Sequence, residues 1–224
     1  MSRTKLAADA LAKYTAGLIM LSLLLFVPAG TLKYPNGWLF IALLFIPMFF
    51  LGIVLLVKAP ELLEKRLNHK EKRSAQSKVV ALAGLVFVLS FIMAGIDYRL
   101  KLTFVPGIVV ISASVILIAS YGLYAEVMRE NAYLSRTIEV QENQKVIDTG
   151  LYSIVRHPMY MATVLLFLSI PLVLGSWISF VLMLVYPVVI AARIRDEELL
   201  LSEELQGYKE YKDKVKYRLI PFVW

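Results

Sequence analysis

Long apolar stretches recur through this chain, and they restrict what it can fold into more than any other feature. A transmembrane helix needs about 20 mostly apolar residues, and Trp38 to Val57 is one run of that length. Apolar side chains make up 59% of the 224 residues and only 18% of residues are charged, which is more apolar surface than one soluble domain buries. Helices satisfy their own backbone polar groups in lipid. The sequence therefore predicts an all-α integral membrane protein.

Six apolar segments have the length or the spacing of membrane helices. The first four are separated by polar turns or loops, whereas the last two share one run, Met159 to Ile194, which Pro171 and Gly175-Ser176 interrupt. Proline and glycine mark such breaks, so we expect this run to fold as a helical hairpin. The predicted spans are 14–32, 38–57, 79–96 and 104–127, followed by the two short hairpin helices.

This pattern divides the chain into two predicted regions. Residues 1–127 contain the four N-terminal spans, and residues 128–224 contain a polar loop, the hairpin and an amphipathic tail. Of the 24 Lys and Arg residues, only Lys33, Arg99 and Lys101 lie on the side of the predicted bundle opposite to both termini. Because cytoplasmic loops are rich in Lys and Arg, we expect both termini and the C-terminal polar segments in the cytoplasm. The net charge of +7 then reflects topology and attraction to anionic lipid, not nucleic-acid binding.

The chain has no cysteine and only two histidines, His69 and His157. This composition excludes disulfides and cysteine nucleophiles and argues against a metal site. His69 has no partner at ligand spacing and receives no role. We find no phosphate-binding glycine loop, dinucleotide fingerprint or nucleophile elbow. Group transfer between two bound reactants fits better, because positioning alone can remove about 7 to 11 kcal/mol of barrier.

A polar cluster at Gly150–Tyr160 stands just ahead of the hairpin. Pro158 is expected to begin the helix, because proline at the first helical position loses no hydrogen bond. Arg156 and His157 would then lie at the N-terminal end of that helix, near the membrane surface. Arg and Tyr also anchor helices at the membrane interface, so an anchor explains these residues about as well as a binding site does.

Two further polar segments are expected at the same end of the hairpin. The loop 128–155 supplies amides such as Gln141, and the tail places Arg193 and Glu197 four residues apart on one helical face. A surface ion pair of this kind would contribute only about 0 to 1 kcal/mol. Convergence of the three segments between membrane and water would instead suit a reaction that joins a lipid-soluble substrate to a polar cosubstrate.

Taken together, these motifs resemble the isoprenylcysteine carboxyl methyltransferase family, which is related to the membrane phospholipid methyltransferases. The resemblance covers roughly residues 141–221. It rests on Gly150-x-Tyr152, Arg156-His-Pro-x-Tyr160, Arg193-x-x-x-Glu197-Glu198, Tyr208-x-x-Tyr211 and Arg218-Leu-Ile-Pro221.

The resemblance implies a methyltransferase that binds S-adenosylmethionine without a Rossmann domain, in a cytosolic site formed by the hairpin, the preceding loop and the tail. Arg193 matches the substrate-side arginine of the family, and it forms the predicted catalytic group with His157 and Glu197. The residues implied to contact the cofactor are Gln141, Gln144, Lys145, Val146, Ile147, Tyr152, His157, Pro158, Met159, Tyr160 and Glu197.

The sequence leaves several alternatives open. Methyl transfer to a carboxylate needs no general base, whereas an amine or thiol acceptor would need one, for which His157 and Glu197 are the candidates. A membrane reductase with a nicotinamide cofactor is a competing function, because sterol reductases have a similar hairpin and an Arg-His-Pro-like segment. A non-enzymatic scaffold whose basic loops bind lipid is another. The acceptor, beyond being lipid-borne or small and hydrophobic, and the oligomeric state are not determined by the sequence.

Overall fold

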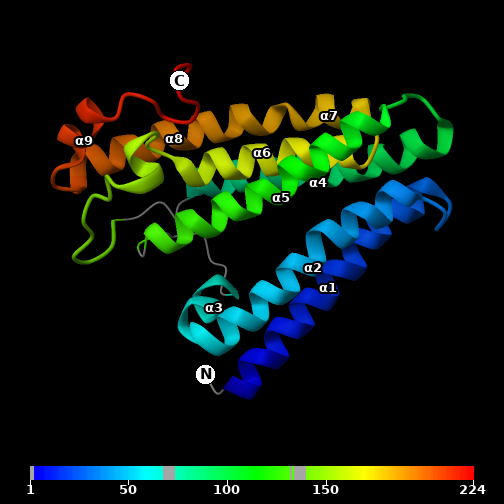
Figure 1. The fold of residues 1–224 in the computed structure, drawn as a ribbon, viewed down its shortest axis with the longest axis horizontal. Helices are drawn as coiled ribbons and strands as arrows, with labels where there is room; N and C mark the ends of the chain where they lie inside the picture. The colour runs from blue at the N-terminus through cyan, green and yellow to red at the C-terminus, as the bar shows by residue number, and fades with distance from the viewer. Residues whose placement is uncertain (1–2, 68–73, 132, 134–139) are drawn as a thin grey trace. The chain divides into compact units, whose positions relative to one another are not determined.

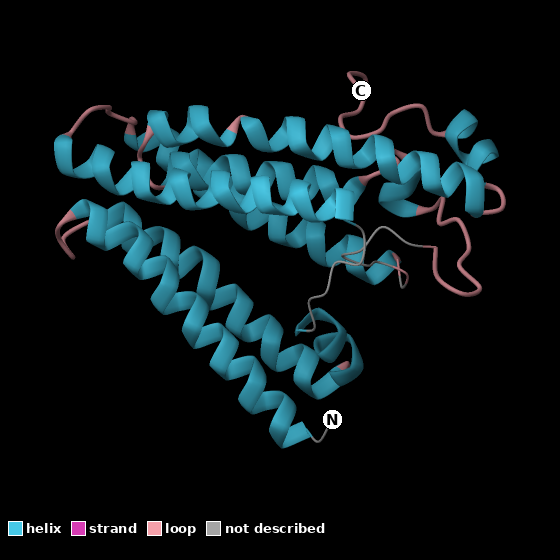
Figure 2. Ribbon diagram, turned by 180° about the vertical axis from the view of Figure 1, so that it is seen from behind, coloured by secondary structure: helices cyan, strands magenta, loops and turns pink. Residues whose placement is uncertain are grey.

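The computed structural model describes residues 3–67, 74–131, 133 and 140–224, and in these ranges it contains helices and loops but no strand (Figures 1 and 2). His69 lies outside the described residues. The all-α prediction is confirmed. The helices are α1 (Arg3–Ala29), α2 (Pro35–Lys58), α3 (Pro60–Leu67), α4 (Ser74–Leu100), α5 (Gly107–Glu130), the 3₁₀ helix η1 (Gly150–Ser153), α6 (Pro158–Val173), α7 (Trp177–Met183), α8 (Val185–Glu204) and α9 (Tyr208–Lys214).

Within the described residues, five helical segments are long and apolar enough to cross a membrane: α1, α2, the Ala81–Leu100 part of α4, α5, and α7 with α8 as Trp177–Glu204. The multi-pass prediction is therefore confirmed. The sixth apolar segment, α6, has only 16 residues, which corresponds to about 24 Å of helix. The side of the membrane on which each end lies stays a prediction.

The described chain forms two compact units whose segments alternate along the sequence. The first comprises residues 1–70, 87–114 and 170–182, and the second comprises residues 71–86, 115–169 and 183–224. The predicted boundary at residue 127 is where the apolar spans give way to a polar loop, and it stays a prediction.

In the first unit, α1 and α2 lie side by side as an antiparallel pair (Figures 1 and 2). Gly95 of α4 packs directly on the backbone of α1. A Cβ atom at this position would lie 2.6 Å from the carbonyl oxygen of Leu25 and 3.0 Å from the amide nitrogen of Ala29. Only glycine permits so close an approach of the two helices.

The α6–α7 turn also belongs to the first unit, and glycine ends α6 there. Gly175 has φ +79° and its N–H donates to the carbonyl of Leu172 (3.1 Å), while the N–H of Ser176 donates to that of Pro171 (3.0 Å). These two bonds form a Schellman motif, which satisfies the last carbonyl groups of a helix. The predicted hairpin break is thus at Gly175-Ser176, whereas Pro171 lies inside α6.

A buried carboxylate ties this turn to the α4–α5 connection. Asp97, which is 1% exposed, accepts hydrogen bonds from the backbone N–H of Thr103 (2.7 Å) and from the hydroxyl groups of Thr103 and Ser176. The indole N–H of Trp177 donates to the carbonyl of Phe104 (3.1 Å). The hairpin tip therefore lies beside the α4–α5 connection. The third predicted span ended at residue 96, but α4 continues to residue 100.

A second break separates α7 from α8 at Leu184. Pro187 has no N–H with which to bond the carbonyl of Met183, four residues earlier, and a proline commonly kinks or interrupts a helix at this point. Beyond the break, α8 runs without interruption to Glu204. It carries Arg193 near its middle and Glu197 and Glu198 further along.

Candidate active site

A pocket in the second unit is lined by residues from the loop before η1, from α6, from α8 and from α9. Aliphatic and aromatic side chains line part of this pocket, and polar or charged side chains line the rest. The lining residues are Asn131, Tyr133, Gln144, Lys145, Val146, Ile147, Tyr152, Arg156, His157, Met159, Tyr160, Arg193, Glu197, Leu201, Leu205, Tyr208 and Tyr211.

Glycine at position 150 allows the chain to turn tightly into η1. Gly150 has φ +52°, and a Cβ atom there would overlap the carboxylate of Glu130. That carboxylate accepts the backbone N–H of Leu151 (3.0 Å), so it satisfies an N–H group at the start of the 3₁₀ helix.

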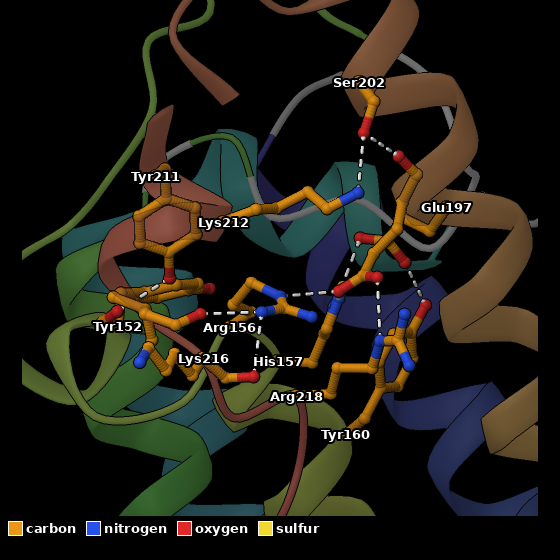
Figure 3. Close-up of polar contacts among 12 residues, drawn as sticks. Tyr152, Arg156, His157, Tyr160, Glu197, Ser202, Tyr211, Lys212, Lys216 and Arg218 are labelled. Carbon is orange, nitrogen blue, oxygen red and sulfur yellow. Dashed lines mark hydrogen bonds and ion pairs between the residues drawn. The ribbon is translucent and has the colours of Figure 1, made fainter. Parts of the chain in front are cut away.

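The same turn places Tyr152 at the pocket. Its hydroxyl accepts a hydrogen bond from the side-chain amide of Asn131 (2.8 Å), and its carbonyl accepts one from the hydroxyl of Tyr211 (2.7 Å; Figure 3). Burial raises the pKa of Tyr152 to about 12. This phenol is therefore a neutral group at physiological pH.

Pro158 is the first residue of α6, as predicted. The two residues before it bond to the C-terminal tail: the backbone N–H groups of Arg156 and His157 donate to the carbonyls of Tyr217 and Arg218, each at 2.9 Å. The tail therefore returns to the N-terminal end of α6 and fixes the backbone from which the arginine and the imidazole project.

One buried carboxylate contacts the basic side chains around this end of α6 (Figure 3). Oε1 of Glu198 accepts a hydrogen bond from Nε of Arg156 (2.7 Å) and lies 3.3 Å from Nε2 of His157. Oε2 of Glu198 accepts a hydrogen bond from Nε of Arg218 (2.9 Å). The Glu198 side chain is 4% exposed. A buried carboxylate is stable in its charged form only with partners of this kind.

A second set of hydrogen bonds links two side chains of α8 through a side chain of α6 (Figure 3). Nε of Arg193 donates to the hydroxyl of Tyr160 (2.9 Å), and that hydroxyl donates to Oε2 of Glu197 (2.6 Å). The predicted pair of charges on one face of α8 is thus joined through a phenol of α6. This arrangement holds the guanidinium at the pocket and leaves the other oxygen of Glu197 beside His157.

Apolar side chains close the part of the pocket next to α9. Leu201, Leu205, Tyr208, Tyr211 and Val215 form a buried cluster, against which Val140 and Val146 of the loop pack. Burial raises the pKa of Tyr208 and of Tyr211 well above the usual value. The Tyr208 hydroxyl is buried and has no hydrogen-bond partner within the described residues.

The structure brings together ten of the twelve residues predicted for the site, and their roles stay predictions. The exceptions are Pro158, which begins α6, and Gln141, whose side-chain amide donates to the carbonyl of Tyr133 (2.7 Å) and shapes the loop. The ten pocket residues are Gln144, Lys145, Val146, Ile147, Tyr152, His157, Met159, Tyr160, Arg193 and Glu197.

Four residues at the site were not among the predicted site residues: Glu198, Arg218, Asn131 and Tyr208. Glu198 and Arg218 stand in the quoted motifs, and the signal that could have identified them is Arg156. An arginine ahead of an apolar helix needs a carboxylate once it is buried. Asn131 carries no signal of this kind in the sequence.

Comparison with known proteins gives two matches. Residues 102–206 match the model of the family described as phospholipid methyltransferase. A stretch of 91 residues is 29% identical to a Delta(14)-sterol reductase of Mus musculus, and it covers 39% of this chain and 22% of the reductase. The family match supports a membrane methyltransferase. The family matched over residues 102–206 is that of isoprenylcysteine carboxyl methyltransferase-like membrane methyltransferases.

Proposed function

We propose that this protein is an integral-membrane methyltransferase that uses S-adenosylmethionine. Its acceptor is lipid-borne or small and membrane-soluble, and the protein is most like an isoprenylcysteine carboxyl O-methyltransferase. The observation that carries the proposal is the chain of hydrogen bonds from Arg193 through Tyr160 to Glu197 at a pocket that also contains His157. Family membership over residues 102–206 supports the same reaction class.

The residues present fit this cofactor chemically. A nucleoside needs an apolar and aromatic wall, for which Leu201, Leu205 and Tyr211 are suitable. An amino-acid group with a positive charge needs a carboxylate, and Oε1 of Glu197 makes no hydrogen bond within the described part of the chain. The unpaired hydroxyl of Tyr208 is a further polar atom that a ligand heteroatom would satisfy.

The bound cofactor would supply an electrophilic methyl group, and an ionised carboxylate accepts a methyl group without losing a proton. Arg193 is proposed to bind the acceptor carboxylate, because a guanidinium has five N–H donors in a planar fork that matches a carboxylate. Tyr160 would fix the direction of that fork through its hydrogen bond to Nε. For an amine or thiol acceptor, His157 or Glu197 would have to accept the proton.

Two measurements test this function in detergent-solubilised full-length protein. Saturable binding of S-adenosylmethionine is expected, and absence of binding at millimolar ligand would overturn the proposal. Arg193→Ala is expected to abolish methyl transfer to an S-prenylated cysteine carboxylate while leaving cofactor affinity within about threefold. Arg195→Ala is the matched control, since this exposed arginine lies two residues further along α8 and should change neither quantity.

The same protein separates the competing functions. A ligand that binds only the folded state raises the melting temperature, so a rise with NADPH and none with S-adenosylmethionine would favour a reductase such as the matched sterol reductase. A lipid-binding scaffold would tolerate Arg193→Lys, because the charge is kept. The methyltransferase would lose most of its rate with that substitution, because lysine cannot form the bidentate pair.

A further inference from the structure

We infer that Glu198 is a positioning residue that holds His157 with its hydrogen on Nε2. Nδ1 of His157 then becomes a hydrogen-bond acceptor, and with Oε1 of Glu197 it forms a subsite for a primary ammonium group. This inference rests on the proposed function and refines it, because S-adenosylmethionine carries such a group at its amino-acid end.

The position of the hydrogen follows from the partners of Glu198. Two guanidinium groups, those of Arg156 and Arg218, donate to its two oxygens at 2.7 and 2.9 Å. Arginine stays protonated in proteins, and a carboxylate between two such cations is ionised and can only accept hydrogen bonds. At the 3.3 Å separation between Nε2 of His157 and Oε1 of Glu198, the imidazole nitrogen must therefore be the donor.

The other ring nitrogen then presents a lone pair to the pocket. In the neutral tautomer that donates from Nε2, Nδ1 is the acceptor. It lies 4.0 Å from Oε1 of Glu197, which is too far for a hydrogen bond. Oε2 of Glu197 already accepts the Tyr160 hydroxyl (2.6 Å), and the Tyr160 ring stacks on the imidazole with centroids 5.7 Å apart. These contacts hold both groups in place.

One donor placed between these two acceptors would satisfy both, and no described residue donates a hydrogen bond to Nδ1 or Oε1. A primary ammonium has three N–H donors and a positive charge, so it can donate to both atoms and offset the charge of Glu197. A sulfonium or a carboxylate has no N–H to give. A primary ammonium is accordingly the ligand group that satisfies both acceptors and the charge.

Nitrogen-15 NMR of the imidazole tests the positioning role without any ligand. In a His69→Gln background His157 is the one remaining histidine, so its two ring nitrogens can be assigned. At neutral pH we expect a protonated Nε2 and an unprotonated Nδ1. A hydrogen on Nδ1, or on both nitrogens, would overturn the inference. Glu198→Gln should change this pattern, whereas Glu203→Gln, an exposed glutamate on the same helix, should not.

Binding of two ligands to wild-type protein tests the ammonium subsite. S-adenosylhomocysteine is compared with its analogue in which hydrogen replaces the amino group. Hydrogen bonds to charged groups contribute about 1.5 to 3 kcal/mol, so the analogue should bind at least about tenfold more weakly. Equal affinities would overturn the subsite and leave the proposed function standing. Binding of neither ligand would instead reject the proposed function, and the ligand-free NMR result would still decide the role of Glu198. Neither the NMR spectrum of the His69→Gln protein nor the wild-type binding comparison depends on the Glu198 variant folding.

Discussion

Tyr208 keeps its hydroxyl buried without a hydrogen-bond partner in the described structure, and this has opposite consequences for stability and for binding. An unsatisfied buried polar group costs about 1 to 3 kcal/mol. We therefore expect Tyr208→Phe to raise the melting temperature of the ligand-free protein in detergent. The further rise caused by S-adenosylhomocysteine should be smaller than in wild-type protein, because the variant cannot form a hydrogen bond to the ligand.

Tyr211→Phe is the matched control for this prediction. It lies three residues away in α9, belongs to the same apolar cluster, and its hydroxyl donates to the carbonyl of Tyr152 (2.7 Å). Its loss should lower the melting temperature, because the Tyr152 carbonyl loses a partner. A Tyr208→Phe protein that melts below wild type would mean that the hydroxyl is already satisfied in the absence of ligand.

Contacts in the site could be predicted from sequence only where the spacing along one helix brings residues to the same face. Arg193 and Glu197 are four residues apart, which places them on one face of a helix. That Tyr160 joins them depends on how α6 packs against α8, and no spacing within one helix contains that information. Glu197 and Glu198 are adjacent and point about 100° apart, so the sequence alone could not say which of them turns toward Arg156.

The crossing of α1 and α4 depends on one glycine, and α4 supplies its own control. A Cβ atom at Gly95 would lie 2.6 Å from the Leu25 carbonyl oxygen, whereas one at Gly84 would meet no atom within 4 Å. Gly95→Ala should lower the melting temperature, because overpacking costs about 1 to 3 kcal/mol. Gly84→Ala should leave it unchanged or slightly higher, because alanine favours helix by about 1 kcal/mol. Equal effects of the two substitutions would mean that the helices do not meet at Gly95.

Helices as elements were more predictable than their ends. Hydropathy located every apolar helix, since a run of spanning length has few other folds available in lipid. The ends depend on local bonds that hydropathy does not register. Asp97 follows an apolar run and was predicted to begin a polar connection. It is instead buried in the last turn of α4, because Thr103 and Ser176 satisfy its carboxylate. Pro187 likewise separates α7 from α8, although the apolar run continues through it.

The distribution of Lys and Arg makes a prediction about the molecule in its membrane. Three apolar helices, α2, α4 and α5, separate Lys33 from the start of α6, and the α6–α8 hairpin returns to the side on which it began. Lys33 and Lys209, both exposed, should therefore lie on opposite sides of the bilayer, with Lys209 in the cytoplasm by the positive-inside rule.

The chain has no cysteine, so Lys33→Cys and Lys209→Cys each provide a single site for a membrane-impermeant thiol reagent. In sealed inside-out vesicles, whose cytoplasmic face points outward, Lys209→Cys should be labelled at once and Lys33→Cys only after detergent is added. Right-side-out vesicles should give the reverse. Labelling of both sites from one side would mean that the chain crosses the membrane an even number of times between them, which contradicts this topology. Labelling of Lys209→Cys at once in right-side-out vesicles would place the pocket at the face opposite to cytosolic S-adenosylmethionine, since Lys209 lies in α9 next to Tyr208 of the pocket.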